Sequence, residues 1–352
     1  MKHVVWLSWL ISVAALAQTP LSGWRYRTEL EIDNSRNPEA LQAYPVVFEL
    51  NTARLIEQGK LGPEGNDVRF TDADGQTPLC FWREGALNQE ATRYWVRIPY
   101  VAPYSRAVIF LYHGNPLAVA SRQYNCTFAF FDDFEGTELN PLQWEKRGRG
   151  QYTLQDGQLR VDAQREDAIL LSRQAFEKPL IVEMQVTDAA GRFTTLALLQ
   201  DDRFSNGYVL ARDGARERME LTLTEGEPTP CGGYAVFSNT RHAASVAPAG
   251  LWSLSWITTN TVFAQWPDGE ALEPNALWQE RPLRVGLGVA ACQRETQGTL
   301  SVDWVRVRKL TSVEPRITVG AERYSEERQA PDAPWMTLPD SSDPLPVMSR
   351  LF

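Results

Sequence analysis

The chain has 352 residues, a formal net charge of −9 and 43% hydrophobic residues. This length suits two domains that each bury a core, and it excludes a small peptide held together mainly by disulfides. Acidic residues outnumber basic ones, 44 to 35, and no basic block interrupts the chain. This balance argues against nucleic acid as a partner, because phosphate binding needs clustered cations.

The first residues have the pattern of a secretory signal peptide. Lys2 is followed by an apolar run from Val4 to Ala17, which closes on the small-residue pattern Ala15-Leu16-Ala17. This run is shorter than the roughly 20 residues of a membrane-spanning helix. We therefore predict cleavage after Ala17, export to the periplasm, cell surface or medium, and no transmembrane segment in the mature chain.

Residues 18–126 are predicted to form a first β-sandwich. Short alternating segments rich in Val, Ile, Tyr and Trp indicate strands, as in WRYRTELEID (24–33), RYWVRIPYV (93–101) and AVIFLYHG (107–114). One helix is expected, within NTARLIEQGKL (51–61), where Asn51 or Thr52 would cap its start.

Residues 127–311 are predicted to form a second β-sandwich. LIVEMQVTD (180–188), WSLSWITTN (252–260) and SVDWVRVRK (301–309) read as strands, and dipeptides such as Asp156-Gly157 supply tight turns between strands. Residues 312–352 contain many prolines and are predicted to be a disordered tail. The fold class is therefore all-β, with two sandwich domains and at most one short helix.

Four cysteines, an even number, fit disulfide formation in an exported chain. Pairing inside each domain, Cys80 with Cys126 and Cys231 with Cys292, is the simplest scheme. Free buried thiols remain an equal alternative, because domains of this size do not need disulfides.

The first domain resembles the secreted family known as DUF2341, a domain of unknown function. The resemblance lies in five blocks that occur in order: GWRYRTELEIDN (23–34), YPVVFELN (44–51), NDVRFTDADGQTPLCFWRE (66–84), ATRYWVRIPYV (91–101) and AVIFLYHGNPLA (107–118). It implies an extracellular β-sandwich module with no established activity.

The second domain resembles concanavalin A-like lectins and glucanases, which are jelly rolls. The blocks are FFDDFEGTELNPLQW (130–144) as an opening strand, YTLQDGQLRVDA (152–163) as the next strand, NGYVLARDG (206–214) and VFAQWPDG (262–269) as hairpins, and GTLSVDWVRVRK (298–309) as a closing strand. The superfamily binds or cleaves glycans and sometimes holds calcium, so this resemblance implies a fold more than a role.

The opening strand carries acids whose role the sequence leaves open. A glucanase would need two carboxylates across a cleft, and Asp133 and Glu135 lack a third acid in the expected pattern. We therefore assign no catalytic residue. In a jelly roll the first and last strands lie side by side, which would bring Asp133 near Asp303 as ligands for Ca²⁺, the only cofactor suggested. Solvated carboxylates at strand edges are the alternative.

Sugar-binding surfaces combine aromatic faces with hydrogen-bonding side chains. The candidate ligand contacts lie near turns of the second domain: Tyr208, Trp266 and Tyr234, with Arg212, Asp201 and Asp202 for hydroxyl groups. The sequence thus favours a secreted, non-catalytic protein that binds a glycan or another cell-surface component through its jelly roll. A polysaccharide hydrolase and a structural envelope module are the alternatives.

Overall fold

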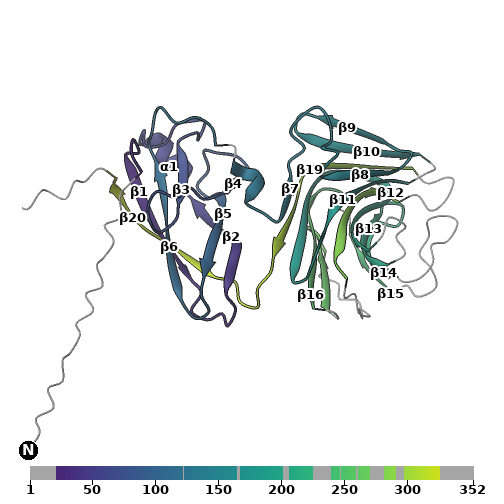
Figure 1. The fold of residues 1–352 in the computed structure, drawn as a ribbon. Helices are drawn as coiled ribbons and strands as arrows, with labels where there is room; N and C mark the ends of the chain where they lie inside the picture. Colours follow the sequence, from purple (N-terminus) through teal and green to yellow (C-terminus); the bar gives the residue numbers. More distant parts are fainter. Residues whose placement is uncertain are drawn as a thin grey trace, which may run out of the picture.

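The computed structural model describes residues 21–121, 123–164, 167–200, 206–224, 239–245, 247–258, 261–269, 281–290 and 297–325. The described chain is almost entirely β-structure in two domains, as the sequence predicts (Figure 1). No helix among these residues has the length and apolar character that a bilayer crossing requires.

The first domain is a sandwich of two antiparallel sheets. One sheet has the strand order β20–β1–β6–β3 and the other the order β2–β5–β4. Their bounds are β1 (Tyr26–Asp33), β2 (Leu41–Leu50), β3 (Val68–Thr71), β4 (Phe81–Glu84), β5 (Thr92–Val101), β6 (Arg106–His113) and β20 (Arg316–Tyr324). Alternate residues of both sheets face inward, so that Leu30, Val46, Phe70, Val96 and Leu111 share one buried core.

The predicted helix is present as α1 (Thr52–Glu57). Asn51 is its N-cap, since the Asn51 side chain accepts a hydrogen bond from the Arg54 backbone N–H at 2.8 Å. A short 3₁₀ helix, η1 (Gln123–Cys126), leads into the second domain.

The second domain is a jelly roll with two curved layers. The front layer has the order β15–β14–β13–β12–β18–β11–β8, and in the back layer β9–β10–β19–β12–β16–β17 are neighbours, with β7 also on β19. The bounds are β7 (Phe130–Asp132), β8 (Trp144–Gly148), β9 (Gln151–Gln155), β10 (Gln158–Gln164), β11 (Ala168–Phe176), β12 (Leu180–Leu199), β13 (Gly207–Asp213), β14 (Arg218–Thr224), β15 (Asn239–Ala244), β16 (Gly250–Thr258), β17 (Thr261–Gln265), β18 (Leu283–Val289) and β19 (Gln297–Lys309).

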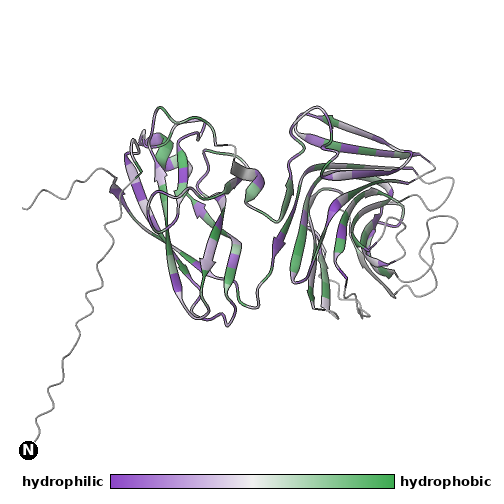
Figure 2. Ribbon diagram, viewed as in Figure 1, coloured by the Kyte–Doolittle hydropathy of each residue, from purple (hydrophilic) through white to green (hydrophobic). Residues whose placement is uncertain are grey.

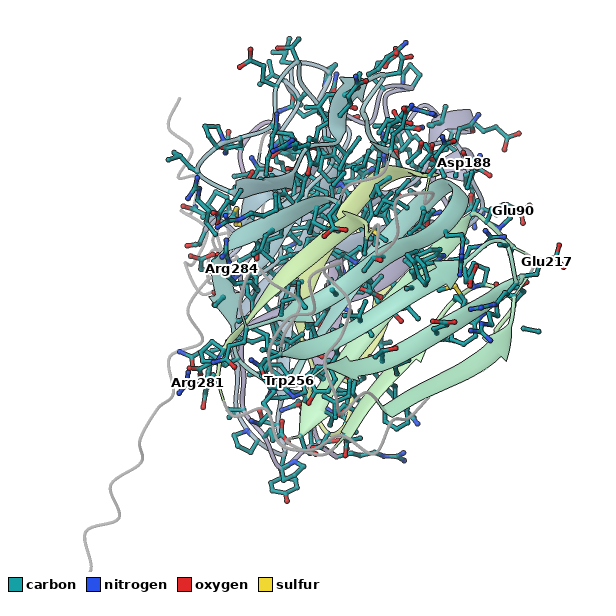
Figure 3. All side chains as sticks on the ribbon, turned by 90° about the vertical axis from the view of Figure 1, so that its right-hand side faces the viewer. Glu90, Asp188, Glu217, Trp256, Arg281 and Arg284 are labelled. Atoms are coloured by element: carbon teal, nitrogen blue, oxygen red, sulfur yellow. A yellow bond between two sulfur atoms is a disulfide. The ribbon has the colours of Figure 1, made fainter. Side chains whose placement is uncertain are left out.

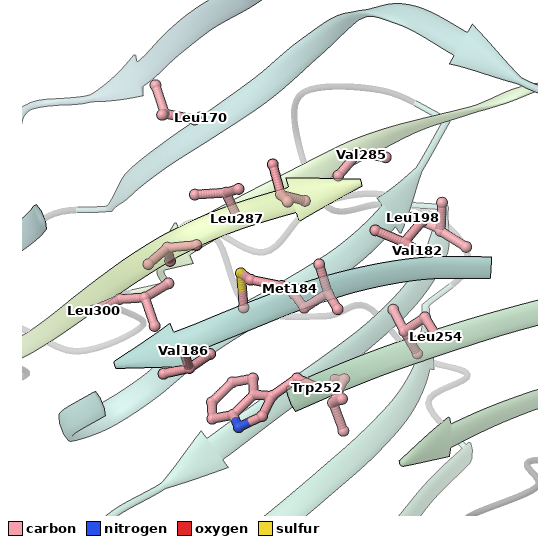
Figure 4. Packing of buried hydrophobic residues seen from close by; sticks show 14 of the residues in the cluster. Leu170, Val182, Met184, Val186, Leu198, Trp252, Leu254, Val285, Leu287 and Leu300 are labelled. Atoms are coloured by element: carbon pink, nitrogen blue, oxygen red, sulfur yellow. The ribbon is translucent and has the colours of Figure 1, made fainter. Parts of the chain in front are cut away.

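The long strand β12 joins the two layers of the jelly roll. Its first half, from Leu180, pairs with β16 and β19 in the back layer, and its second half, to Leu199, pairs with β13 and β18 in the front layer. Apolar side chains from both layers meet between them, including Met184, Leu198, Trp252 and Leu287 (Figure 4). Hydrophobic and polar residues alternate along these strands, as Figure 2 shows.

The prediction that residues 312–352 form a disordered tail is wrong for the first part of this segment. Residues Arg316–Tyr324 form β20, which pairs antiparallel with β1 and completes a sheet of the first domain. The reason is local, because RITVGAERY lacks proline and is rich in strand formers, whereas the prolines lie further on. The jelly roll is thus inserted between β6 and β20 of the first domain, and both of its ends are attached there.

The predicted Cys80–Cys126 disulfide is present. It ties the segment before β4 to η1, at the start of the connection to the jelly roll. Cys231 and Cys292 lie outside the described residues.

Candidate functional site

The two domains meet through an aromatic cluster, which we call the joint. Trp82 and Trp95 come from the first domain, Phe128 and Phe131 from the connection and β7, and Trp304 from β19. The ring of Trp82 lies 4.9 Å from that of Phe131 and 5.5 Å from that of Trp304. Trp304 faces away from the jelly-roll core and buries its ring in the joint.

Arg306 lies at the centre of the joint, with only 1% of its side chain exposed. Its guanidinium lies between the rings of Trp95 and Trp304, at 4.3 and 4.5 Å from their centroids. It donates to Glu183 of β12 at 2.7 Å and to Glu84 of β4 at 3.1 Å. One cation therefore bridges a carboxylate from each domain, in an arrangement that combines ion pairing with cation–π contacts.

A second arginine extends this network toward the surface. Arg308 donates to Glu183 at 3.1 Å and to Glu314 at 3.3 Å, and the Tyr44 hydroxyl donates to Glu314 at 2.6 Å. Burial alone would raise the pKa of Glu183, but the charges of Arg306 and Arg308 outweigh it and hold this pKa below its usual range. The same Glu183 carboxylate thus serves two guanidiniums.

A groove of about 270 Å³ runs beside the joint, between Pro45 and Val47 of the first domain and Leu251 of the second. The charged side chains along it are already bonded to one another, as Arg308 is to Glu183 and Glu314. The groove is therefore part of the structural contact between the domains.

An acidic hollow lies where the opening and closing strands of the jelly roll meet. β7 pairs with β19, with Asp132 opposite Val305, so the predicted adjacency of these strands is confirmed. The hollow, of about 210 Å³, is lined by Asp132, Asp133, Glu135 and Glu138. Burial and the nearby Asp133 charge raise the pKa of Asp303.

Asp132 has a structural role in this hollow. Its carboxylate accepts a hydrogen bond from the Trp144 indole N–H at 2.6 Å and another from the Phe134 backbone N–H at 2.8 Å. Burial raises its pKa, although these two hydrogen bonds oppose the rise.

The calcium site predicted on Asp133 and Asp303 stays a prediction. In the part of the chain that the structure describes, no three Asp, Glu, His or Cys side chains are arranged to hold a metal ion. Asp133 and Asp303 alone supply few of the six to eight oxygens that Ca²⁺ takes.

The outer face of the front layer lies on the side of the sheet opposite the core. Its central side chains are apolar and buried: Ile169, Leu171, Ala197, Leu199, Val209 and Ala211 form a second cluster. Gly286 lies in register with Leu171 and Ala197 within this face. Charged side chains such as Glu217 and Arg284 lie at the margins of the sheet (Figure 3).

Asp213 and Glu220 lie diagonally across β13 and β14 on this outer face, the kind of spacing that a carboxylate pair would need. Asp213, however, has no exposed side-chain surface, and it is bonded to Arg192 at 3.3 Å and Arg216 at 3.2 Å. Glu220 pairs with Arg218. A third acid on this face, Glu145, pairs with Arg284 at 2.7 Å.

The predicted ligand contacts in the jelly roll are wrong where the structure describes them. Tyr208 has no exposed surface and Trp266 has 2%, because both rings point into the core. Arg212 is buried and donates to the Ala189 carbonyl at 3.2 Å. The other three contacts, Asp201, Asp202 and Tyr234, lie outside the described residues.

The sequence reasoning missed the joint. Glu183 and Arg306 alternate with core residues on their strands, a pattern that is the same for a solvated face and for a face covered by another domain. The available signal was Trp95, which faces away from the first-domain core that Tyr94 and Val96 enter. An outward-facing tryptophan indicates a contact surface.

Residues 64–147 match the model of a known family. It is described as "Domain of unknown function (DUF2341)". The DUF2341 match runs from before β3 into β8, so it includes Trp82, Glu84, Trp95 and the disulfide, and hence one side of the joint. No curated protein matches the chain.

Several solved structures are similar to about half of the chain. One comes from work on endo-acting O-glycanases that members of the human gut microbiota express to initiate mucin breakdown; it is 14% identical, with a TM-score of 0.40, over 52% of this chain and 99% of that one. A lichenase from a mouse hindgut metagenome is 15% identical, with a TM-score of 0.38, over 51% and 99%. The pseudo beta-1,3-glucanase of Mycobacterium tuberculosis is 14% identical, with a TM-score of 0.37, over 52% and 99%. Similarities with sequence identities and TM-scores this low assign no activity to the chain.

Proposed function

We propose that this chain is a carbohydrate-binding protein that does not hydrolyse its ligand. The ligand class follows the resemblance of the second domain to concanavalin A-like jelly rolls, whose members bind or cleave glycans. The choice between binding and cleavage rests on the chemistry of the front layer.

One observation carries the choice of binding over cleavage. A glycosidase needs two carboxylates that both reach the glycosidic bond, one as acid and one as nucleophile or base. Asp213, the described acid diagonal to Glu220, has no exposed side-chain surface and is held by two arginines. A substrate has no access to such a carboxylate.

The proposed place of action is outside the cytoplasm, at the cell surface or in the periplasm or medium. The support is the signal-peptide pattern of Lys2 and the apolar run from Val4 to Ala17. Sequencing the N-terminus of the protein purified from its native host tests this, with Gln18 expected as the first residue and Met1 as the contradicting result.

A structural envelope module is the second candidate, and the joint favours it. The jelly roll is attached to the first domain at both ends, and Arg306 bonds to a carboxylate of each domain. Such an arrangement suits a protein whose two domains move as one body.

The test combines a binding assay with an assay for cleavage. The protein is incubated with insoluble and soluble β-glucans, galactans and mucin glycans, and both bound protein and new reducing ends are measured. We expect retention on at least one glycan without release of reducing sugar, in the wild type and in Glu220→Gln alike.

Two outcomes would overturn the proposal. Release of reducing sugar that is lost in Glu220→Gln or Asp133→Asn would make the protein a hydrolase. If the protein shows a cooperative melting transition, and is therefore folded, but binds no glycan, the structural module would be favoured.

A further inference from the structure

A second hollow, in the first domain, is not explained by the fold. It has a volume of about 510 Å³, within the range of about 300–1,000 Å³ that ligand pockets occupy. Its walls are the segment between α1 and β3 and the segment after β6, elements that lie together in Figure 1.

The floor of the first-domain hollow is built around a buried carboxylate. Asp67 accepts hydrogen bonds from the Gly62 N–H at 2.9 Å and the Gly114 N–H at 3.2 Å, so it ties the two walls together. A side chain at Gly114 would meet the Tyr26 ring at 2.6 Å, so only glycine allows this close approach. The hollow is thus a fixed shape.

Most of the polar side chains that line this hollow make no hydrogen bond or ion pair with other described residues. The side chains of Arg25, Glu64 and Asn66 bond to no other described residue, and neither does the Nδ2 group of Asn115. Apolar surface from Ile56, Leu61, Pro63, Pro116 and Ala118 lies among them. The hollow therefore offers donors and acceptors together with apolar faces.

A pair of tyrosines, half-buried Tyr26 and exposed Tyr324, lies next to one wall of the hollow. The Tyr26 ring, which touches Gly114, lies 5.3 Å from the ring of Tyr324. Tyr324 is 64% exposed, and the next residue, Ser325, donates its backbone N–H to the Arg25 carbonyl at 2.8 Å. Strand β20, which returns from the jelly roll, thus places an aromatic face beside the hollow.

This combination indicates the chemical class of the ligand. The lining carries one cation, Arg25, against two carboxylates, Glu64 and Asp67, which argues against a phosphate group. Closely spaced donors and acceptors suit vicinal hydroxyls, and aromatic and proline faces suit the C–H face of a sugar ring. We propose that the first-domain hollow binds a neutral saccharide, an inference that rests on the proposed function and moves the ligand site out of the jelly roll.

The test uses the full-length mature chain and a panel of neutral di- and trisaccharides based on glucose, galactose and N-acetylglucosamine, titrated by calorimetry. Asn115→Asp removes the Nδ2 donor but keeps the Oδ1 acceptor that the Leu117 N–H uses at 3.0 Å. Glu64→Ala and Tyr324→Ala remove an exposed acceptor and the exposed ring. Glu177→Ala, an exposed glutamate in the second domain, is the matched control.

We expect at least one saccharide to bind, with affinity lowered about fivefold or more in Asn115→Asp, Glu64→Ala and Tyr324→Ala, and unchanged in Glu177→Ala. Equal affinity in all variants would overturn the inference and leave the proposed function standing. Failure of every saccharide to bind would overturn both. Binding of the apolar dye 1-anilinonaphthalene-8-sulfonate to the wild type but not to Tyr324→Ala, without competition from any saccharide, would instead indicate a site for an apolar ligand and would overturn the inference.

Discussion

The back layer of the jelly roll holds carboxylates in two places, one buried and one half-buried, and their surroundings differ. At the joint, Glu183 lies between Arg306 and Arg308, whose charges hold its pKa below the usual range. At the acidic hollow, burial raises the pKa of Asp132 in its lining and of Asp303 on the closing strand, and no ion pair between a described arginine and either acid is present. Burial raises the pKa at both places, and the net shifts are opposite because only Glu183 has guanidinium partners that outweigh it.

The difference indicates which carboxylates stabilise the folded protein and which destabilise it. A buried carboxylate with guanidinium partners is stabilised in its charged form, whereas one next to other carboxylates is stabilised in its neutral form. We therefore expect that removing a charge from the joint lowers the free energy of unfolding, and that removing a negative charge at the acidic hollow raises it.

Replacing Arg306 should have the largest effect. Arg306→Leu leaves Glu183 and Glu84 without their shared partner and removes the cation between two tryptophans. We expect a loss of about 3–5 kcal/mol in the free energy of unfolding, measured by chemical denaturation. Arg93→Ala, which removes a more exposed partner of the same Glu84, should lose about 1 kcal/mol or less. Equal losses in both variants would contradict the central place of Arg306.

Removing the charge of Glu183 should alter the pH dependence of stability. Since its folded pKa is lowered from about 4.5, its contribution is present above that value and is lost as the pH falls through the lower folded value. Glu183→Gln should lose about 1–3 kcal/mol at neutral pH.

Melting temperatures of both proteins from pH 7 to pH 3 measure this. The difference between wild type and Glu183→Gln should start to shrink below about pH 4.5, where the carboxylate gains its proton in the unfolded chain before it does so in the folded protein. A constant difference across this range would show that Glu183 stabilises the joint without its charge.

Asp303→Asn should have the opposite sign and a smaller size. Because the folded pKa of Asp303 is raised, the charged carboxylate destabilises the protein at neutral pH, and wild-type stability falls as the pH rises through that pKa. Solvent screening at this half-buried site limits the expected gain to a few tenths of a kcal/mol. The variant's melting temperature at pH 7 should rise slightly, and a clear fall would contradict the comparison.

Calcium should have the smallest effect. Asp133 and Asp303 lack a third described ligand, so excess Ca²⁺ or a chelator should leave the melting temperature unchanged. A Ca²⁺-dependent rise that disappears in Asp303→Asn would establish the site that the sequence suggested.

Alternation along the strands predicted the fold class, because a half-buried strand must place apolar residues on every second position. The pairing of β7 with β19 followed from the jelly-roll resemblance. The return of β20 to β1 did not, because pairing across nearly three hundred residues leaves no local signal in either strand.

The ligand contacts failed for a related reason. Tyr208 lies opposite Leu198 in the β12–β13 pair and belongs to the core, although its position beside a turn suggests exposure. Trp266 lies just before Pro267 and Asp268, yet Gly269 packs so closely on its indole that the turn covers the ring. Turn residues alone therefore do not indicate exposure.

The most direct test of binding without hydrolysis measures the length of one labelled oligosaccharide before and after it binds to the protein. An oligosaccharide that the glycan screen identifies is bound to excess protein, held for a day, released by denaturation and analysed by mass spectrometry. Binding without hydrolysis predicts that the ligand is recovered at its original length. Recovery of shorter oligosaccharides, absent when Glu220→Gln protein is used, would contradict the account.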